Sequence, residues 1–342
     1  SATPFTAQNW TTGQFDENGR PELVKEAVDL ALYAVVPGPT GAHNWHPMAF
    51  NPDTGLVYIP VNEIPFFYDK TRNVEDSKSF WNIGYDAAAG WPVEYPAGTL
   101  DAVRDLDGGS LLAWDPVKAE PRWAVPFPLP LNGGVLSTQA GLVFQGNKFG
   151  EFVAYDAETG ERLWADKLVG NAAAAPMTYE IDGEQYLSVL SGWGSVSSLI
   201  AGFTYGEAKS KEPARVITFK LGGDGDMPAA LVDNVVRTPQ SPMFGEPDQH
   251  QLGMQRYAES CHFCHGAFAV GGGVVPDLRW SALAGNEQAW DLVVREGALE
   301  KQGMVSFAGR LSKEDTDAIR AYVVQQAWLA VANGDALPPQ DG

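Results

Sequence analysis

The chain of 342 residues carries 23 basic and 43 acidic side chains, a formal net charge of −20, and 44% of its residues are hydrophobic. This acidic balance, without any cluster of Lys or Arg, excludes a nucleic-acid surface and argues against binding to an anionic membrane. No run approaches the roughly 18 apolar residues of a membrane span, and the length allows two domains.

Residues 1–222 have the pattern of many short strands. Apolar and β-branched runs alternate with turns rich in Gly, Pro, Asn and Asp, which is typical of an antiparallel all-β domain. The clearest predicted strands are residues 55–61, 110–115, 141–146, 151–156, 185–192 and 214–221.

One internal repeat lies within this part. The segment AYDAETGERLW, which ends at Trp164, matches AWDPVKAEPRW, which ends at Trp123, at a spacing of about 40 residues. That spacing is typical of a four-stranded propeller blade, in which a Trp docks into the neighbouring blade. A chance resemblance of two hairpins is the alternative, because only two copies are visible and one has Ala119 where the other has Gly160.

Residues 223–250 are rich in Gly, Pro and Asp and are predicted to be a linker, with DGD as a solvated turn rather than a calcium-loop fragment. From residue 251 to 342 the periodicity is helical. Apolar residues share one face around Trp290, with Gly297 as a C-cap, and Ser312 can cap a last helix. An all-α domain of roughly 90 residues is therefore expected after the β part.

Residues 257–266 read YAESCHFCHG and contain the only two cysteines of the chain. C-x-x-C-H is the attachment signature of c-type haem, in which two thiols on one turn of backbone bond to the porphyrin. The histidine that follows is held beneath the iron as an axial ligand. We predict that Cys261 and Cys264 hold haem c covalently, that His265 binds the iron and that His262 is a bystander.

Two other chemistries use the same residue types. A structural zinc site needs four ligands, but there is no second C-x-x-C, and His43 and His46 lie in the β part. A redox dithiol of the thioredoxin type lies in a βαβ unit, whereas helices are predicted around this motif. Covalent haem fits the motif better than either.

A haem bound in this way needs a second axial ligand. Met304 lies in the segment GMVSFAG before the last predicted helix, where its thioether can point at the iron. Ligation by His and Met raises the reduction potential, which suits an electron relay. Met254 is interpreted as core packing, and the Pro276 carbonyl is expected to accept a hydrogen bond from the His265 ring.

The α domain resembles a class I cytochrome c through CHFCH, VVPDL and GMVSFAG. The β part is similar to the C-terminal part of the eight-bladed propeller of alcohol dehydrogenases that depend on pyrroloquinoline quinone (PQQ). Four motifs in order carry this likeness, namely residues 41–60, 132–146, 152–164 and 175–194. The whole chain thus resembles a quinohaemoprotein alcohol dehydrogenase, which implies about half of a propeller followed by a cytochrome c domain.

The resemblance places Asn44 of HNWHP beside the reactive carbonyl of PQQ, and Gly192 and Trp193 of SGWG against the cofactor. Without it, a turn Asn and a Trp that caps a blade are the simpler interpretations. The chain departs from the family in having Leu131 where an aromatic residue usually precedes NGG, and Ser195 where a second glycine is common.

The larger departure concerns what lies before this chain in the family: the catalytic base, the calcium ligands and a vicinal disulfide. No catalytic residue is therefore expected here, and calcium is expected to be bound mostly by residues outside it. We expect an N-terminal polypeptide to complete the propeller, separated by processing or by a split gene; the alternative is that this sequence is a fragment of one longer chain. A partial propeller would otherwise expose strand edges and an apolar wall.

The expected function is alcohol oxidation, with electrons passing from PQQ through haem c to a soluble cytochrome, a copper protein or a quinone. Covalent haem and an exported quinoprotein predict the periplasm, with the signal peptide outside this chain. A non-catalytic cytochrome subunit with a propeller docking module is the alternative. A propeller enzyme with its own carboxylate site is a further rival, but residues 40–200 offer no convincing carboxylate cluster.

Overall fold

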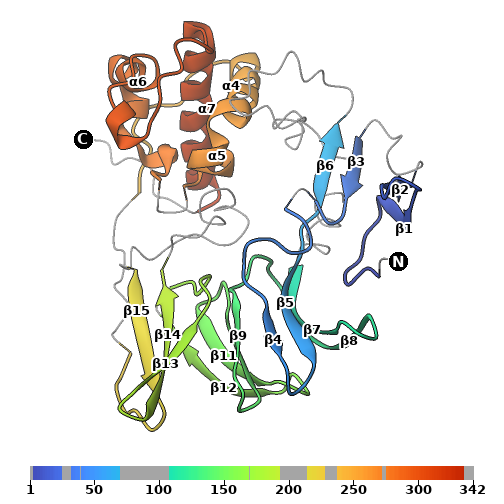
Figure 1. Cartoon of the computed structure of the whole chain (residues 1–342). Helices are drawn as coiled ribbons and strands as arrows, with labels where there is room; N and C mark the ends of the chain where they lie inside the picture. Colours follow the sequence, from blue (N-terminus) through green and yellow to red (C-terminus); the bar gives the residue numbers. More distant parts are fainter. Residues whose placement is uncertain are drawn as a thin grey trace. The chain divides into compact units, whose positions relative to one another are not determined.

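The structure is a computed structural model, which describes residues 3–24, 32–38, 40–69, 108–168, 170–192, 214–227, 237–271 and 275–334. These residues form two compact units, which are treated separately: a β unit up to residue 227 and a helical unit from residue 237 (Figure 1). No helix among them is long and apolar enough to cross a membrane.

The β unit contains two four-stranded antiparallel sheets in which the strand order follows the chain order, although β6 of another sheet lies between β5 and β7 in the sequence (Figure 1). The first sheet consists of β4 (Ala49–Asn51), β5 (Leu56–Glu63), β7 (Gly108–Asp115) and β8 (Glu120–Phe127). The second consists of β9 (Val135–Ser137), β10 (Leu142–Gly146), β11 (Glu151–Asp156) and β12 (Arg162–Lys167).

A third sheet has three described strands, β13 (Met177–Ile181), β14 (Glu184–Ser191) and β15 (Arg215–Lys220). Two small pairs complete the unit, β1 (Thr11–Phe15) with β2 (Pro21–Leu23) and β3 (Leu32–Val35) with β6 (Phe66–Asp69). All six clearest strands predicted from the sequence are confirmed, because each corresponds to one of β5, β7, β10, β11, β14 and β15.

The three large sheets pack face to face through apolar side chains. Tyr58 and Leu111 of the first sheet share a buried cluster with Val143 and Val153 of the second. The opposite face of the second sheet, which includes Phe152, packs against Val189 and other residues of the third sheet. The middle sheet is therefore buried on both faces, as in a propeller blade.

The internal repeat occupies equivalent places in the first two sheets. Its copies are the hairpins β7–β8 and β11–β12, and Trp123 Nε1 donates a hydrogen bond of 3.1 Å to the Ala157 carbonyl in the next sheet. Gly160 lies against the Trp123 ring and has φ +75°, while Ala119, its counterpart, has φ 56°. The predicted docking of a blade Trp on its neighbour is confirmed for Trp123.

The helical unit consists of four α-helices and several short 3₁₀ turns in its described residues (Figure 1). The α-helices are α4 (Pro247–Ser260), α5 (His262–His265), α6 (Glu287–Val294) and α7 (Lys313–Ala332); the turns are η2 (Ala267–Ala269), η3 (Leu278–Trp280), η4 (Ala282–Gly285) and η5 (Glu300–Gln302). Ser312 caps α7 in a capping box with Asp315, which confirms the predicted N-terminus.

Part of the segment predicted to be a linker packs on the helical unit. Helix α4 begins at Pro247. Before it, the Ser241 carbonyl accepts a 2.9 Å hydrogen bond from Trp328 Nε1, and the Arg320 guanidinium lies 4.3 Å from the centre of the Phe244 ring. Residues 241–246 are therefore held by contacts with the helices.

Helices α4 and α7 cross at Gly253. A Cβ there would lie 2.0 Å from the Ala318 carbonyl oxygen and 2.8 Å from Tyr322 Cβ. We expect Gly253→Ala to lower the free energy of unfolding of the helical unit by about 2 kcal/mol, because close-packed helices cannot accept the extra methyl group. Denaturant unfolding measures this, with Gly309→Ala as the control because its Cβ would meet no atom within 4 Å. Equal losses for the two variants would contradict this account of the crossing.

Candidate functional site

The two cysteines lie on one turn at the junction of α4 and α5. Cys261 is the C-cap of α4, and its carbonyl accepts hydrogen bonds from the backbone N–H groups of Cys264 (3.2 Å) and His265 (2.9 Å). Both thiols are free; Cys261 is buried and Cys264 exposed. Burial raises the pKa of the Cys261 thiol to about 12. One turn thus presents two thiols and an imidazole together, as the sequence motif predicts.

His265 is oriented by the loop that contains Pro276. Its Nδ1 donates to the Pro276 carbonyl at 3.0 Å, since a carbonyl oxygen can only accept. The ring is buried, and this burial lowers the pKa of His265 against the opposing effects of the Pro276 carbonyl and Asp277. The neutral ring therefore keeps a lone pair on Nε2, the form that ligates a metal. The predicted hydrogen bond to Pro276 is confirmed.

His262 is bound to the backbone of its own helix. Its Nδ1 donates to the Ala258 carbonyl, and burial lowers the pKa of its imidazole to about 4. Its ring lies beside Phe263, with 4.0 Å between the ring centres. These contacts give His262 a packing role, and its lack of a metal role stays a prediction.

The two candidate methionines have similar surroundings. Met254 and Met304 are both partly buried and pack against the core cluster that contains Tyr257, Phe307 and Tyr322. The Met304 backbone N–H donates to the Leu299 carbonyl at 3.2 Å, which ties its loop to the preceding turn. That Met304 ligates the iron and Met254 packs in the core stays a prediction.

Asn44 is held within its own loop of the β unit. Its Nδ2 donates to the Thr40 carbonyl at 2.8 Å, and its Oδ1 accepts from the Trp45 backbone N–H at 2.9 Å. Gly192 donates its N–H to the Asn171 carbonyl, and a Cβ there would lie 2.9 Å from Ala214 Cβ. Trp193 lies outside the described residues. The contact of these three residues with a cofactor stays a prediction.

A group of buried polar side chains surrounds the segment 131–134, near the Asn44 loop. Asn62 Oδ1 accepts from the Leu131 N–H at 2.7 Å, and Gln145 Nε2 donates to the Gly133 carbonyl at 2.8 Å. His46 belongs to the group because Pro47, the next residue, contacts Gly134. Burial, and then His43 and Lys148, lower the pKa of His46.

Several atoms of this group have no hydrogen-bond partner although they are buried: Thr40 Oγ1, His46 Nδ1, Asn62 Nδ2 and Gln145 Oε1. Buried polar groups are nearly always bonded, so such a cluster indicates a bound ligand or water. These residues were not predicted from the sequence, except that the loop of Asn44 was. Their only signal was that Asn62 and Gln145 are polar residues near the ends of apolar strands.

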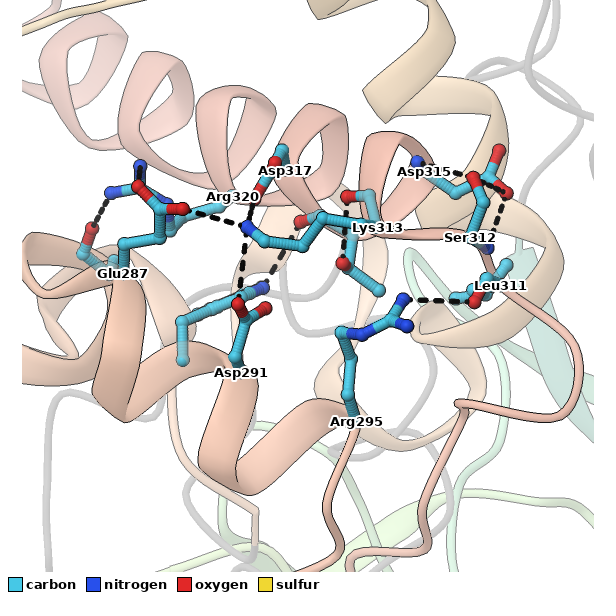
Figure 2. Close-up of polar contacts among 12 residues, drawn as sticks. Glu287, Asp291, Arg295, Leu311, Ser312, Lys313, Asp315, Asp317 and Arg320 are labelled. Atoms are coloured by element: carbon cyan, nitrogen blue, oxygen red, sulfur yellow. Dashed lines mark hydrogen bonds and ion pairs between the residues drawn. The ribbon is translucent and has the colours of Figure 1, made fainter.

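Charged side chains join α6 to α7 on the exposed side of the helical unit. Figure 2 shows the Lys313 amine between the carboxylates of Glu287 (2.9 Å), Asp291 (3.1 Å) and Asp317. The hydrogen bond from Lys313 lowers the pKa of Glu287. Within the part of the chain that the structure describes, no group of three or more His, Cys, Asp or Glu could hold a metal ion.

We expect Lys313→Met to lower the free energy of unfolding by only about 1 kcal/mol or less, because the amine is partly exposed and solvent screens the pairs. Glu287 has a lowered pKa in the folded state, so its contribution is present above the ordinary Glu pKa of about 4.3 and is lost as the pH falls. Chemical unfolding at pH 7 and pH 3 measures both effects. A loss that is larger at pH 3 would contradict the pairing.

Comparison with known proteins connects both units to one kind of enzyme. Residues 107–187 match the family described as glucose/ethanol/alcohol dehydrogenase, beta-propeller domain, and residues 248–323 match the family described as cytochrome c oxidase, cbb3-type, subunit III. Quinohemoprotein alcohol dehydrogenase ADH IIB of Pseudomonas putida is 41% identical over 96% of this chain and 46% of its own length. The chain is homologous to the quinohaemoprotein alcohol dehydrogenases.

Solved structures of quinohaemoprotein alcohol dehydrogenases agree with this assignment. ADHIIG from Pseudomonas putida HK5 superimposes with a TM-score of 0.82 at 34% identity, over 98% of this chain and 49% of that one. The Comamonas testosteroni enzyme gives a TM-score of 0.73 at 34% identity, over 96% and 47%. The predicted propeller part and cytochrome c domain are thereby confirmed. The chain spans about half the length of the curated relatives it matches.

Proposed function

We propose that this chain is part of a PQQ- and haem c-dependent alcohol dehydrogenase, in which the β unit lines the PQQ pocket and the helical unit transfers electrons. The observation that carries the proposal is the C-x-x-C-H turn, in which the Pro276 carbonyl fixes the His265 ring with Nε2 available. The relatives named quinohemoprotein alcohol dehydrogenases, a term that denotes a quinone and a haem, match residues of both units.

The residues of the helical unit fit haem c. Cys261 and Cys264 would bind it through thioether bonds, His265 Nε2 would be one axial ligand, and Met304 the other. Such a haem accepts and donates single electrons. This chain would fix the imidazole through the Pro276 carbonyl, and the apolar cluster of the helical unit would line the haem site. The hydrogen bond to the imidazole and the apolar surroundings would both set the reduction potential of the haem.

The β unit offers a group of buried polar atoms that would suit PQQ, an anionic tricyclic quinone. The atoms without partners on Thr40, His46, Asn62 and Gln145 are donors and acceptors that a polar ligand can satisfy. Asn44, Gly192 and Trp193 would lie against it. PQQ supplies the two-electron oxidation of the alcohol when bound, and calcium would be held by residues mostly outside this chain.

The remaining parts of the proposed enzyme lie outside this chain. An N-terminal polypeptide would complete the propeller and supply the catalytic base. Joining the haem to the dehydrogenase through one chain gives the electron transfer an intramolecular partner. We place the enzyme in the periplasm, with a soluble cytochrome, a copper protein or a quinone as the acceptor. Which alcohol the enzyme oxidises would depend on loops of both polypeptides.

The proposal is tested by intact mass and visible spectroscopy of the purified protein. We expect one covalent haem on the peptide that contains Cys261 and Cys264, a second polypeptide that co-purifies, and PQQ in a denaturing extract. A haem-free peptide would overturn the haem assignment.

One observation favours a second candidate function, an electron-transfer subunit whose propeller part only docks. The Asn44 amide is already bonded to Thr40 and Trp45, as in a structural turn. This candidate predicts haem without extractable PQQ, and no loss of alcohol oxidation in the complete protein on Asn44→Ala. If the chain is instead part of the PQQ-dependent enzyme, we expect Asn44→Ala to reduce kcat by about 100-fold, as loss of one oxyanion donor does.

Paired substitutions separate the two methionines. We expect Met304→Leu to lower the reduction potential of the haem and change its visible spectrum, because a thioether ligand stabilises reduced iron. Met254→Leu is the matched control, since both residues are partly buried against the same cluster. Spectroelectrochemical titration measures both. The same small change in each variant would contradict the assignment of Met304.

A further inference from the structure

Lys148 lies in the turn between β10 and β11 and is only 9% exposed. A lysine is almost never buried to this extent unless its charge is matched by another group. Its backbone N–H donates to Asn132 Oδ1 at 3.3 Å, so the turn is held against the segment 131–134. A positive charge is therefore enclosed beside the buried polar side chains that surround this segment.

The order of the strands places Lys148 at the end of the sheets where the residues expected to contact the cofactor lie. Neighbouring strands run antiparallel, so the entry to the first strand of a sheet and the turn between its second and third strands lie at the same end. Asn44 precedes β4, Lys148 follows β10, and Gly192 follows β14.

Contacts between the sheets show that these ends lie together. A Cβ on Gly134 would lie 2.6 Å from Pro47 Cδ, which joins the second sheet to the first. At the end of the β10–β11 turn, a Cβ on Gly150 would lie 2.7 Å from the Gly170 carbonyl oxygen, and one on Gly170 would lie 3.1 Å from Gly192 Cα. The loops at this end therefore form one continuous group across all three sheets.

Two of these loops reverse the usual distribution of polar and apolar side chains. In the β10–β11 turn Lys148 is buried while Phe149 is 47% exposed, and in the loop of Asn44 His46 is buried while Trp45 is 63% exposed. A turn that only joined strands would bury the aromatic ring and expose the charged or polar group. Local reversals of this kind are typical of functional sites.

The polar groups around Lys148 have unused capacity for hydrogen bonds. His46 lies close enough for the Lys148 charge to lower its pKa, in addition to the larger effects of burial and of His43. His46 Nδ1, Asn62 Nδ2 and Gln145 Oε1 are buried and have no hydrogen-bond partner. An enclosed cation thus lies beside polar atoms that a ligand can bond.

A carboxylate is the group that this arrangement suits best. It pairs with an ammonium group and accepts hydrogen bonds from an amide such as that of Asn62. Glu151, the acidic residue nearest to Lys148 in the sequence, bonds Asn147 at 3.0 Å and Arg162 at 3.1 Å. The charge of Glu151 is thus matched by Arg162, and a carboxylate of a bound ligand can lie at Lys148.

We infer that Lys148 binds a carboxylate of the quinone cofactor. The inference rests on the proposed function, because it takes PQQ, whose carboxyl groups are ionised at neutral pH, as the occupant of the site. Attraction between the ammonium and the carboxylate is stronger here than in water because the amine is buried. Lys148 holds the cofactor in position and takes no part in the oxidation itself, so it is a positioning residue.

Calorimetric titration of PQQ into the PQQ-free complete protein, with calcium present, tests the inference. We expect Lys148→Met to weaken PQQ binding about 10- to 100-fold, the effect of losing one hydrogen bond between charged groups. Lys167→Met is the matched control, since Lys167 is exposed on β12 of the same sheet and its loss changes the net charge equally. Unchanged affinity in a folded Lys148→Met protein would overturn the inference.

A second ligand shows whether Lys148 recognises charge. The methyl ester of PQQ has the same rings but carries neutral ester groups in place of the carboxylates. We expect the unsubstituted protein and Lys148→Met to bind this ester with the same affinity, because the ammonium has no anion to pair with. An equal loss of affinity for PQQ and for its ester would mean that Lys148 only shapes the site, and would overturn its proposed role.

The unsubstituted protein supplies an independent measurement if the substituted one does not fold. Amine labelling followed by mass spectrometry should modify Lys148 more slowly when PQQ is bound, while the exposed Lys167 is modified at the same rate with and without PQQ. Labelling of Lys148 that PQQ does not slow would count against the contact.

These binding measurements also separate this inference from the proposed function. A complete protein that binds no PQQ would contradict the proposed function, and this inference with it. A protein that binds PQQ equally well with and without Lys148 would contradict only the role of Lys148 and would leave the proposed function standing.

Discussion

Replacing Arg256 with methionine is expected to lower the free energy of unfolding of the helical unit by about 3–5 kcal/mol. Its guanidinium bonds Glu259 Oε2 at 2.7 Å and Asp315 Oδ1 at 2.8 Å, and it therefore joins α4 to the first turn of α7. The Glu259 side chain is fully buried. Without Arg256 this carboxylate would lose the cation that compensates its burial, which is why breaking such a pair costs more than an exposed ion pair does.

The measurement is urea unfolding followed by circular dichroism, with Lys301→Met as the control because Lys301 is exposed and should change stability by less than about 0.5 kcal/mol. The double variant Arg256→Met, Glu259→Gln should recover part of the loss, since the buried charge is then removed as well. Since Cys261 caps α4, we also expect less covalent haem in the Arg256 variant. A loss within 1 kcal/mol would show that the network does not support the helix crossing.

The second large effect is expected at His265. His265→Ala should abolish the low-spin visible spectrum of the haem, because the axial imidazole is removed. His262→Ala is the matched control: both histidines lie in α5, and both donate Nδ1 to a backbone carbonyl, of Pro276 and Ala258 respectively. We expect the His262 variant to keep the spectrum. Loss of the spectrum in both variants, or in the His262 variant alone, would contradict the assignment of the ligand.

Local rules were enough to predict the six clearest strands and the start of the last helix. The strands around Tyr58 and Phe152 carry β-branched and aromatic residues between Gly and Asp turns, and Ser312 with Asp315 forms a capping box that marks the start of α7. The hydrogen bond from His265 to Pro276 was also predictable, because a ligating histidine usually needs a carbonyl for its second nitrogen.

Other features depend on contacts between distant residues. The ion pairs of Lys313 with Glu287 and Asp291 join α7 to α6, and spacing within either helix predicts only the i,i+4 pair of Lys313 with Asp317 (Figure 2). The polar group around Asn62 and Gln145 is likewise assembled by separate strands that meet at one loop. The contacts of Ser241 and Phe244 show that a Gly- and Pro-rich composition does not exclude packing against helices.

The place of β15 in its sheet was not predictable from its own sequence. The strand alternates like any two-sided strand, with Ile217 and Phe219 inward and Val216 and Thr218 outward. In the structure β15 pairs with β14 and is the last described strand of the third sheet. Sheet order is a tertiary property, so it had to come from the structure.

In the proposed function, electrons from an alcohol reach the haem of this chain through PQQ. The direct measurement is the visible spectrum of the complete protein, oxygen-free and with calcium, after a primary alcohol is added with and without PQQ. We expect the haem to become reduced only when PQQ is present. A haem that stays oxidised while the PQQ-loaded protein oxidises the alcohol with an artificial acceptor, or that is reduced without PQQ, would contradict it.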